Sequence, residues 1–584
     1  MKMSDHVETD IGEFPKEWEV KKLEEIAKIE SGKREKGGGK ETGEVISLGG
    51  EHISPDGKII LNSPKYISKK FYDSLKSGKV KEKDIILVKD GATTGKAAFL
   101  EKLPAKEVAV NEHLFIIRSK TSNIDQKFLY YIIISNIFQN QIKSSFHGII
   151  GGITKSEIEE VYIPIPPLEE QKKIVELLQK ATDIYYTLKD YIIQIRNSTE
   201  TITKVIRKEL LTRGIGHSDY VETDIGEFPK DWEVRRLNEI AELQRGLSYS
   251  GSEKSKDEIP DGYLFLTLNS VKEGGGLKED GWTWIKSDRL KERHFVREGD
   301  ILIANTEQSK DGSLIGSSAI VNFPEWYKKD KAVFSMDLSK LLLRISNMDV
   351  NFLFYHLSFV QPLARKYHTG TNVWHLNLDS WAKDLLVPIP PVEEQKKIVE
   401  LLQKVDELII RFNDFLQNLE DEANTLYKSI LRLALTGKLT EDWRRQIILL
   451  ISVVIPYLVY QASKIKGRPV YMTELMKYLF LLQKEYNINL AYNFEPYKYG
   501  PFTPQLYKDL EELKDRIEVK EVKDDVDKSL ITSKELPQVN QDIANAVNDL
   551  INRFGNKDLK ELLSYVYKKY PEYTIKSELN LDEF

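Results

Sequence analysis

The sequence predicts an α+β protein with two related domains, a long antiparallel two-helix coiled coil between them, and a mostly α-helical C-terminal domain. Three observations carry this prediction: a tandem repeat, a long apolar periodicity after each copy, and the end of the repeat after Thr440. The chain has 584 residues, of which 41% are hydrophobic and 30% charged. That composition is typical of folded, water-soluble proteins, and the length allows several domains with cores of their own.

Composition excludes several kinds of site. The sequence has no cysteine, which rules out disulfides, thiolate zinc sites, iron–sulfur clusters and cysteine nucleophiles. The segment MKMSDHVETD lacks the apolar stretch of a secretory signal. The longest uncharged run, residues 446–463, is shorter than a membrane span of about 20 apolar residues. We therefore expect a buried helix there and a cytoplasmic protein with no membrane partner.

Two segments recur almost unchanged along the chain. VETDIGEFPKEWEVKKLEEIA begins at Val7, and VETDIGEFPKDWEVRRLNEIA begins at Val221. In the same way, IPIPPLEEQKKIVELLQK begins at Ile163 and VPIPPVEEQKKIVELLQK begins at Val387. Because these frames match while the residues between them differ, we predict a pseudo-symmetric protein whose two domains recognise different things.

A long helix is predicted after each Pro-Pro pair, over residues 168–213 and 392–437. Apolar residues step alternately by four and three over five heptads, which is the pattern of a coiled coil. Short connections that contain glycine favour antiparallel pairing of the two helices; packing of each helix on its own domain is the alternative. The expected contact residues are Ile174, Leu178, Ala181, Tyr185, Leu188, Ile192, Ile195, Thr199, Ile202 and Ile206, with Ile398, Leu402, Val405, Ile409, Phe412, Leu416, Leu419, Ala423, Leu426 and Ile430.

The remaining parts of the repeat, residues 1–167 and 214–391, are predicted to be α+β domains with mixed or antiparallel sheets. Short strand-like runs such as DIILVKDG and HLFIIRS alternate with Gly, Pro and Asn turns. One helical stretch follows at 128–146, and the second domain repeats this order with a helix at 351–368.

Charge distinguishes the two domains, although the whole chain carries a net charge of −6. Residues 31–150 hold 20 Lys and Arg against 13 Asp and Glu, a net charge of +7. Residues 245–380 hold 18 of each kind. A basic surface suits the phosphates of DNA, so the net charge of the first domain fits a DNA-binding domain. A lysine-rich surface that only faces solvent is the alternative.

Two loops in each domain carry side chains suited to DNA. One follows a buried strand, at 89–96 and 305–310, and the other follows the helix, at 147–155 and 368–375. Lysines and backbone N–H groups suit phosphates, Asn and Gln suit adenine, and Glu suits cytosine; ordinary turns are the alternative. The candidate DNA-binding residues are Lys33, Arg34, Lys89, Asp90, Thr93, Thr94, Lys96, His147, Lys155, Arg245, Asn305, Thr306, Glu307, Gln308, Lys310, His368, Thr371, Asn372 and His375.

Motifs for catalysis are missing from the sequence. It contains no H-E-x-x-H, no G-x-S-x-G and no G-x-x-x-x-G-K-[ST] run. The sequence NSPKY at 62–66 differs from the N-P-P-Y loop of adenine methyltransferases at its second proline, and we predict a turn there. No catalytic residue and no metal site is therefore expected in this chain.

The repeated frame I-G-E-F-P-x-[ED]-W-E-V and the run P-x-P-P-[LV]-x-E-Q-x-x-I resemble the specificity subunit of type I restriction-modification systems, over residues 7–437. The resemblance implies two target-recognition domains separated by an antiparallel coiled coil, and a bipartite double-stranded DNA target with a gap of fixed length. It also implies that this chain has no catalysis and no cofactor of its own. Its expected partners are two modification subunits that use S-adenosylmethionine, with a restriction subunit that uses ATP and Mg²⁺ as a further partner.

Some residues can be carried over from this family pattern. They are Pro166, Pro167, Glu170, Gln171 and Ile174, with Pro390, Pro391, Glu394, Gln395 and Ile398. We assign Glu170, Gln171, Glu394 and Gln395 to the face that binds protein partners. The base-reading residues cannot be carried over in this way.

Residues 441–584 depart from the repeat. MTELMKYLFLLQKE followed by Y-x-Y-G-P-[FY] is similar to the Panacea-type, antitoxin-associated domain, a small helical module. The resemblance implies that this part binds a protein partner, such as a toxin, through Tyr497, Tyr499 and Phe502; a helical structural appendage is the alternative. For the whole chain, a toxin-neutralising regulator is the second hypothesis, and an autonomous methyltransferase is a third that the missing methyl-donor loop disfavours.

Overall fold

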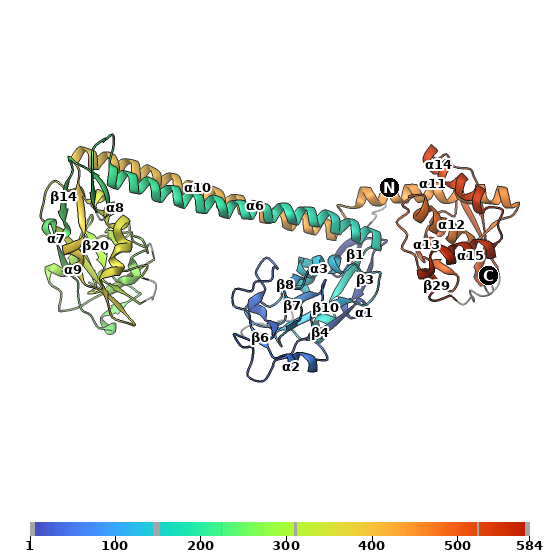
Figure 1. Ribbon diagram of the computed structural model, residues 1–584, viewed down its shortest axis with the longest axis horizontal. Coiled ribbons are helices and arrows are strands. Elements are labelled where there is room, and N and C mark those ends of the chain that lie inside the picture. Colours follow the sequence, from blue (N-terminus) through green and yellow to red (C-terminus); the bar gives the residue numbers. More distant parts are fainter. Residues whose placement is uncertain are drawn as a thin grey trace. The chain divides into compact units, whose positions relative to one another are not determined.

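The computed structural model describes residues 6–143, 152–223, 225–278, 280–308, 312–522 and 525–577. The chain forms two compact units (Figure 1). One unit combines residues 1–187 with residues 422–584, and the other holds residues 188–421. Each unit contains one of the two repeated α+β domains with parts of both long helices, and the first unit also contains the C-terminal domain.

The first domain is built on a four-stranded antiparallel sheet in the order β4-β10-β7-β8. A smaller sheet, β6-β5-β9, includes one parallel pair. The strands are β1 (His6–Thr9), β2 (Gly12–Pro15), β3 (Glu19–Lys22), β4 (Ala27–Ser31), β5 (Val45–Leu48), β6 (Tyr66–Ile67), β7 (Ile85–Val88), β8 (Ala97–Phe99), β9 (Val108–Val110), β10 (Leu114–Ser119) and β11 (Tyr162–Ile165). The helices are α1 (Leu23–Ile26), α2 (Lys69–Ser74), α3 (Gln126–Ile134), α4 (Asn136–Lys143) and α5 (Lys155–Glu159).

The second domain repeats this order, with a four-stranded sheet β15-β24-β20-β22. Its other strands form a five-stranded sheet β16-β18-β17-β23-β19 and a three-stranded sheet β21-β26-β25. The strands are β12 (Tyr220–Thr223), β13 (Gly226–Pro229), β14 (Glu233–Arg236), β15 (Ala241–Arg245), β16 (Lys254–Ser255), β17 (Tyr263–Leu266), β18 (Trp282–Ile285), β19 (Phe295–Val296), β20 (Ile301–Ala304), β21 (Thr306–Glu307), β22 (Ser318–Ile320), β23 (Ala332–Phe334), β24 (Leu338–Leu343), β25 (His368–Thr369), β26 (Trp374–Leu376) and β27 (Leu386–Ile389). The helices are α7 (Leu237–Ile240), α8 (Val350–Val360) and α9 (Leu378–Asp384).

The central strand of each domain is apolar on both faces because both faces are covered. In β7, Ile85 and Leu87 enter a core with helix α3, while Ile86 and Val88 enter a core with the smaller sheet. Strand β20 divides its side chains between two cores in the same way. Alternate residues of a strand point to opposite faces, so a continuous apolar run fits this position. The observed sheets agree with the predicted mixed or antiparallel α+β fold.

Two long helices, α6 (Leu168–Lys208) and α10 (Val392–Leu435), pass from one unit to the other. In the first unit, the ring of Tyr185 stacks on Tyr427 with centroids 4.6 Å apart. In the second, Arg207 donates a 2.6 Å hydrogen bond to Asp406. Within each unit the helices therefore pair in antiparallel sense, with later residues of α6 opposite earlier residues of α10.

The predicted list of contact residues is wrong in part, although the spacing of seven recurs. Polar contacts between the two helices are made at Thr182, Lys189 and Arg196, which are seven residues apart. Four residues expected in the contact are exposed: Ile195 at 40%, Ile202 at 58%, Phe412 at 37% and Leu426 at 62%.

The Glu-Gln pair that begins each long helix is largely buried, which corrects its assignment to a partner-binding face. Glu170, Gln171 and Gln395 have no exposed surface. Gln171 accepts a 2.8 Å bond from the Asp125 N–H and donates to the Asn123 and Pro166 carbonyls. Gln395 repeats these bonds with the counterpart residues Asp349, Asn347 and Pro390. The motif therefore anchors each long helix to the loop before α3 or α8, because its amide group satisfies three backbone groups there.

The acidic member of each pair holds a different segment. Glu170 accepts hydrogen bonds from Trp18, Thr440 and Arg444, and burial raises its pKa even though the Arg444 guanidinium opposes this. Glu394, which is only partly buried, accepts bonds from Trp232 and His217 and from the backbone N–H of Ile215. Each carboxylate thus binds the chain that follows the other long helix.

The described part of the C-terminal domain has five α-helices, which agrees with the predicted mostly helical domain, and two small antiparallel sheets that the prediction omitted. By length and composition, α11 is the one helix among the described residues that could cross a membrane. Its residues Val454, Leu458 and Ala462 are instead buried in the core of this domain. The elements are α11 (Glu441–Lys466), β28 (Val470–Tyr471), α12 (Met472–Glu485), β29 (Glu495–Tyr497), β30 (Gly500–Phe502), α13 (Gln505–Glu512), β31 (Ile517–Val522), β32 (Asp525–Ser533), α14 (Gln541–Phe554) and α15 (Leu559–Lys569).

Candidate nucleic-acid interface

In the first domain the structure brings the two predicted loops together. Strand β7 ends at Val88, and the next two residues, Lys89 and Asp90, contact the start of the segment before α5. Asp90 pairs with Gly152 as an isolated β-bridge, and the Ile153 N–H donates a 2.8 Å bond to the Lys89 carbonyl. Two segments about sixty residues apart in sequence therefore form one continuous surface.

A chain of charged side chains extends this surface. The His113 ring bonds to the Asp90 carboxylate and lies 3.4 Å from Glu112, which pairs with Arg34 at 3.2 Å. This network joins two predicted residues, Arg34 and Asp90, through two that the sequence analysis missed. His113 precedes strand β10 directly, and a polar residue at the end of a buried strand was the only signal that could have identified it.

The rest of the first loop is a compact turn. Thr94 donates through its hydroxyl to the Gly91 carbonyl at 2.7 Å, and the Lys96 N–H donates to the Thr93 carbonyl at 3.1 Å. The Lys89 ammonium lies 5.5 Å from the centre of the Phe115 ring. The side chains of Lys33 and Lys155 are exposed, and Lys155 pairs with Glu159. His147 lies outside the described residues.

The second domain joins its two loops in the same manner. Thr306 of β21 pairs with His375 of β26, and β26 also pairs with β25, where His368 faces Leu376. The His368 ring stacks on Trp374 with centroids 3.9 Å apart. Trp374 was not among the predicted residues, and it fixes the orientation of a histidine that was.

Three predicted DNA-binding residues of this domain are buried, and their prediction is corrected. Asn305, Thr306 and Glu307 are exposed by 3%, 7% and 1%. The Glu307 carboxylate accepts bonds from the Leu314 and Ile315 N–H groups, so it holds its own loop instead of facing a cytosine. Burial under the β21-β26 pairing explains why a polar strand end is not a base-reading position here.

The other predicted residues of the second domain lie at the surface. Those with exposed side chains are Arg245, Gln308, His368, Thr371, Asn372 and His375. Lys310 lies outside the described residues. Within the described residues, no group of three or more His, Asp or Glu side chains is arranged to hold a metal ion. The two surfaces can thus supply cations, amides, hydroxyls and imidazoles, which are groups that contact phosphates and base edges.

Comparison with known proteins agrees with this description. The family model for the type I restriction modification DNA specificity domain matches residues 15–196 and 229–420. The MjaVIII specificity subunit of Methanocaldococcus jannaschii is 26% identical over 370 residues, which cover 62% of this chain and 80% of the relative. The putative MjaX specificity subunit of the same organism is 26% identical over 74% of this chain and 96% of its own length.

A solved structure shows the same fold. It comes from work on complex assembly and conformational transition of the type I R-M system, and it has a TM-score of 0.56 at 20% identity. The match covers 73% of this chain and 99% of that one. With the family model covering most of both repeats, the chain belongs to the family of type I restriction-modification DNA specificity proteins, which recognise DNA and are not themselves catalytic.

Proposed function

We propose that this chain recognises a bipartite double-stranded DNA target, with one half-site for each domain. The observation that carries the proposal is the backbone pairing of two polar loops in each domain, Asp90 with Gly152 and Thr306 with His375. Each domain thereby presents one surface made from segments distant in sequence. The surfaces carry different side chains, so the two half-sites are expected to differ in sequence.

The two long helices act in this proposal as a spacer. Helix α6 has 41 residues and α10 has 44, and at 1.5 Å per residue each is about 60 Å long or slightly more. A helix pair has a fixed length, and a fixed spacing between DNA-reading domains selects half-sites at a fixed interval. The gap in the target would then depend on the number of residues in these helices.

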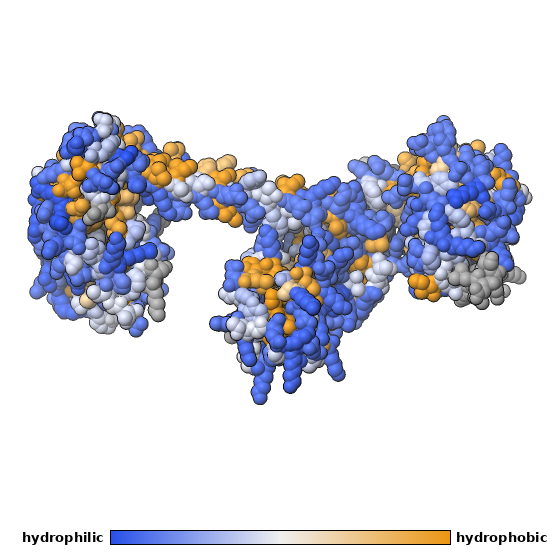
Figure 2. Space-filling model, in the orientation of Figure 1, coloured by the Kyte–Doolittle hydropathy of each residue, from blue (hydrophilic) through white to orange (hydrophobic). Residues whose placement is uncertain are grey.

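The same helices are proposed to dock the modification subunits. Their surface carries apolar side chains (Figure 2), including Leu408 and Phe415, which are 63% and 59% exposed. A groove of about 500 Å³ runs between the helices here and is lined by Thr199, Ile202, Thr203, Ile206, Val405, Leu408, Ile409, Arg411, Phe412 and Phe415. An apolar face of this kind favours packing of further helices. S-adenosylmethionine, Mg²⁺ and ATP would be bound by the partner subunits.

Methylome sequencing of cells that carry the chain with its modification subunit tests this function. We expect two different methylated half-sites separated by a constant number of base pairs. In vitro, the isolated chain should bind DNA weakly with a steep dependence on salt, and it should discriminate between sequences once the modification subunit is added. Equal affinity of the assembled complex for all duplexes would contradict the proposal.

A second function is proposed for the C-terminal domain. The hairpin of β29 and β30 places the Tyr497 and Phe502 rings 4.5 Å apart, and the Tyr497 side chain is exposed at the surface. Exposed paired aromatic rings are common anchors of protein interfaces, which supports a protein partner, such as a toxin-like protein, for this Panacea-like domain. Affinity purification with wild-type chain and with Tyr497→Ala tests this, and the same proteins recovered with both would contradict it.

A further inference from the structure

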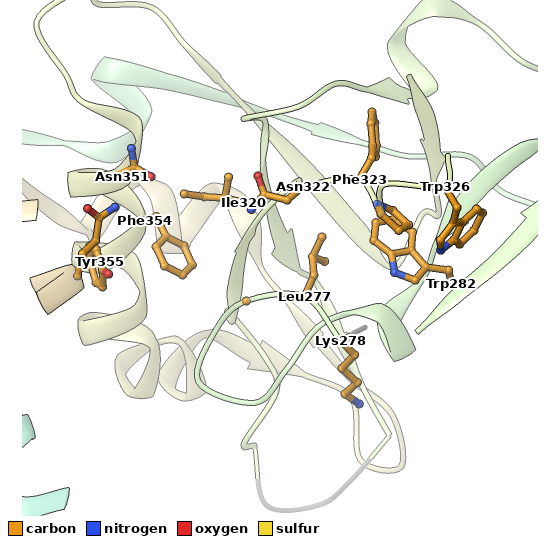
Figure 3. A pocket seen from close by; sticks show the side chains of 13 residues that line it. Leu277, Lys278, Trp282, Ile320, Asn322, Phe323, Trp326, Asn351, Phe354 and Tyr355 are labelled. Carbon is orange, nitrogen blue, oxygen red and sulfur yellow. The ribbon is translucent and has the colours of Figure 1, made fainter. Parts of the chain in front are cut away.

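The second domain contains an open pocket of about 610 Å³ that the DNA-reading loops do not use (Figure 3). Trp282, Phe323 and Trp326 lie at one end of it, and Phe354 and Tyr355 lie at the other. Its volume is within the range of sites for small organic ligands. The remaining lining residues are Gly276, Leu277, Lys278, Ile320, Asn322, Pro324, Asn351 and Gln403.

Several polar groups of this pocket are available to a ligand. Among the described residues, the side chains of Asn322, Asn351 and Gln403 have no hydrogen-bond partner, and Lys278 has no ion-pair partner. Trp326 is 58% exposed and packs on the Trp284 and Tyr327 rings, with centroids 6.3 Å away in both cases. No acidic residue is among the lining residues that the structure describes.

The first domain fills the corresponding position with its own side chains. Strand pairing shows which residues of the two domains correspond. Phe99 of β8 lies opposite Ile85 of β7, and Ile320 of β22 lies opposite Ile301 of β20, so Phe99 and Ile320 occupy corresponding positions. Lys127 and Asn351 correspond because each lies two residues after the Asp that caps α3 or α8. In the first domain Lys127 pairs with Glu101 and lies 5.4 Å from the Phe99 ring.

The second domain has replaced this packing with smaller neutral groups. Ile320, Asn322 and Asn351 stand where the first domain has Phe99, Glu101 and Lys127. Neither the ring nor the ion pair is present, and the space opens between the amides. At these three positions the first domain therefore packs its own side chains together, whereas the second domain lines an open pocket.

We propose that this pocket binds a nucleobase together with the phosphate attached to its sugar. Aromatic rings provide surfaces on which any base can stack. Asn and Gln amides can donate to and accept from the edge of a base. Lys278 supplies a cation for the phosphate, and the lack of carboxylates in the lining favours an anionic ligand. A free mononucleotide and an unstacked nucleotide of DNA share this chemistry, and the test below separates them.

The first arm of the test uses the full chain and isothermal titration calorimetry. The probes are the 5′-monophosphates of deoxyadenosine, deoxyguanosine, deoxycytidine and thymidine, and deoxyribose 5-phosphate serves as the control without a base. We expect at least one mononucleotide to bind and the sugar phosphate not to bind. Trp326→Ala should weaken binding at least about tenfold because the base would lose the exposed Trp326 indole as a stacking surface. Tyr460→Ala, at an exposed aromatic residue of α11, should leave binding unchanged.

A filled-pocket variant provides the decisive comparison. The triple change Ile320→Phe, Asn322→Glu and Asn351→Lys installs side chains that already pack together in the first domain. We expect this variant to keep its unfolding temperature and to lose nucleotide binding.

The second arm compares a perfect duplex with a duplex that carries one extrahelical adenine. A preference for the extrahelical base that the triple variant loses would identify DNA as the source of the ligand. Mononucleotide binding without this preference would identify a free nucleotide. Binding of none of the four nucleotides, or undiminished binding by the triple variant, would overturn the proposal. A protein partner that the triple variant loses, with no nucleotide bound by either chain, would assign the pocket to a protein and also overturn it.

Discussion

The indole N–H of Trp18 donates a 3.0 Å hydrogen bond to the carboxylate of Glu170, at the first turn of α6. Arg444 and Thr440, which lie beyond the end of α10, bond to the same carboxylate. The corresponding pair in the second repeat, Trp232 and Glu394, makes a 3.1 Å bond. The buried carboxylate of Glu170 therefore connects the start of α6 to the segment around Trp18 and to the chain after α10. The family motif that contains Glu170 stabilises the fold here and does not form a binding surface.

Replacement of Arg444 should lower the free energy of unfolding. Arg444→Met leaves the Glu170 carboxylate buried without its cation, and breaking a buried pair in this way typically destabilises a protein by about 3 to 5 kcal/mol. Urea denaturation of the first unit measures this change. The matched control is Arg445→Met, which breaks an exposed pair with Glu441 and should cost less than about 1 kcal/mol. Equal destabilisation of the two variants would show that the Glu170 pair is not the anchor.

The stability of the second domain should depend on pH through His356. Burial lowers the pKa of this imidazole to about 4 from the usual 6.5. Between these values the unfolded chain binds a proton that the folded chain does not, so the free energy of unfolding falls as pH decreases from 6.5 to 4. The full decrease is about 3 kcal/mol. Denaturation in urea between pH 4 and 7 measures it.

The control for this prediction comes from the first repeat, where Ile132 occupies the corresponding buried position. His356→Ile removes the 3.0 Å bond from the imidazole N–H to the Leu386 carbonyl, which costs about 1 kcal/mol at every pH. It should also remove this part of the pH dependence. An unchanged slope in the variant would assign the dependence to other groups.

Much of the architecture could be predicted because a repeat is a strong signal. Matching frames at Val7 and Val221 predicted two copies of one domain, and the spacing after each Pro-Pro pair predicted two long helices. Individual contact residues of the helices could not all be predicted. Ile202 and Leu426 are exposed, because apolar residue type alone does not decide which of two neighbouring positions of a helix faces its partner.

The candidate site was harder to predict from sequence. The position of the loop at 89–96 could be inferred because a strand ends at Val88. The burial of predicted DNA-binding residues such as Glu307 could not be inferred from their residue type. Glu307 looked like a base-reading carboxylate, yet it caps two N–H groups of its own loop. His113 joins the surface only through strand register, which places it beside Asp90. The burial of Glu307 and the position of His113 both depend on which segments pair in the folded chain. The residues next to each of them in the sequence do not reveal that pairing.

The two DNA-reading surfaces should be separable by mutation. Lys89→Gln with Lys96→Gln should weaken binding to the first half-site only. The slope of log K against log salt should fall by about 0.9 for each phosphate that the chain no longer neutralises. Arg245→Gln is the matched change in the second domain and should affect the second half-site only. Competition assays with duplexes mutated in one half-site at a time measure both effects, and equal weakening at both half-sites would contradict separate reading.

The apolar face of the long helices should be needed for partner binding. Leu408→Glu and Phe415→Glu place charges where a partner helix would pack. Each change replaces an exposed apolar side chain, which the partner would bury, with a carboxylate, so the yield of modification subunit should fall by at least about tenfold. Co-purification of tagged chain with the modification subunit measures this. Ile575→Glu, at a C-terminal residue that is 79% exposed, is the control and should bind normally.

The length of the long helices should set the gap between half-sites. Four residues are inserted after Tyr191, and four are inserted after Asn418 on the opposing stretch of α10. Lys189 and Glu420, which lie 3.5 Å apart, are on the same side of both insertions, so their pairing can be kept while the helix pair becomes longer. Each insertion adds about 6 Å and rotates the remainder of its helix by about 40°. Since base pairs are about 3.4 Å apart, methylome sequencing should find a gap longer by about two base pairs with both half-site sequences retained. An unchanged gap would mean that the helices do not measure the distance, whereas altered half-site sequences would mean that they also shape the reading surfaces.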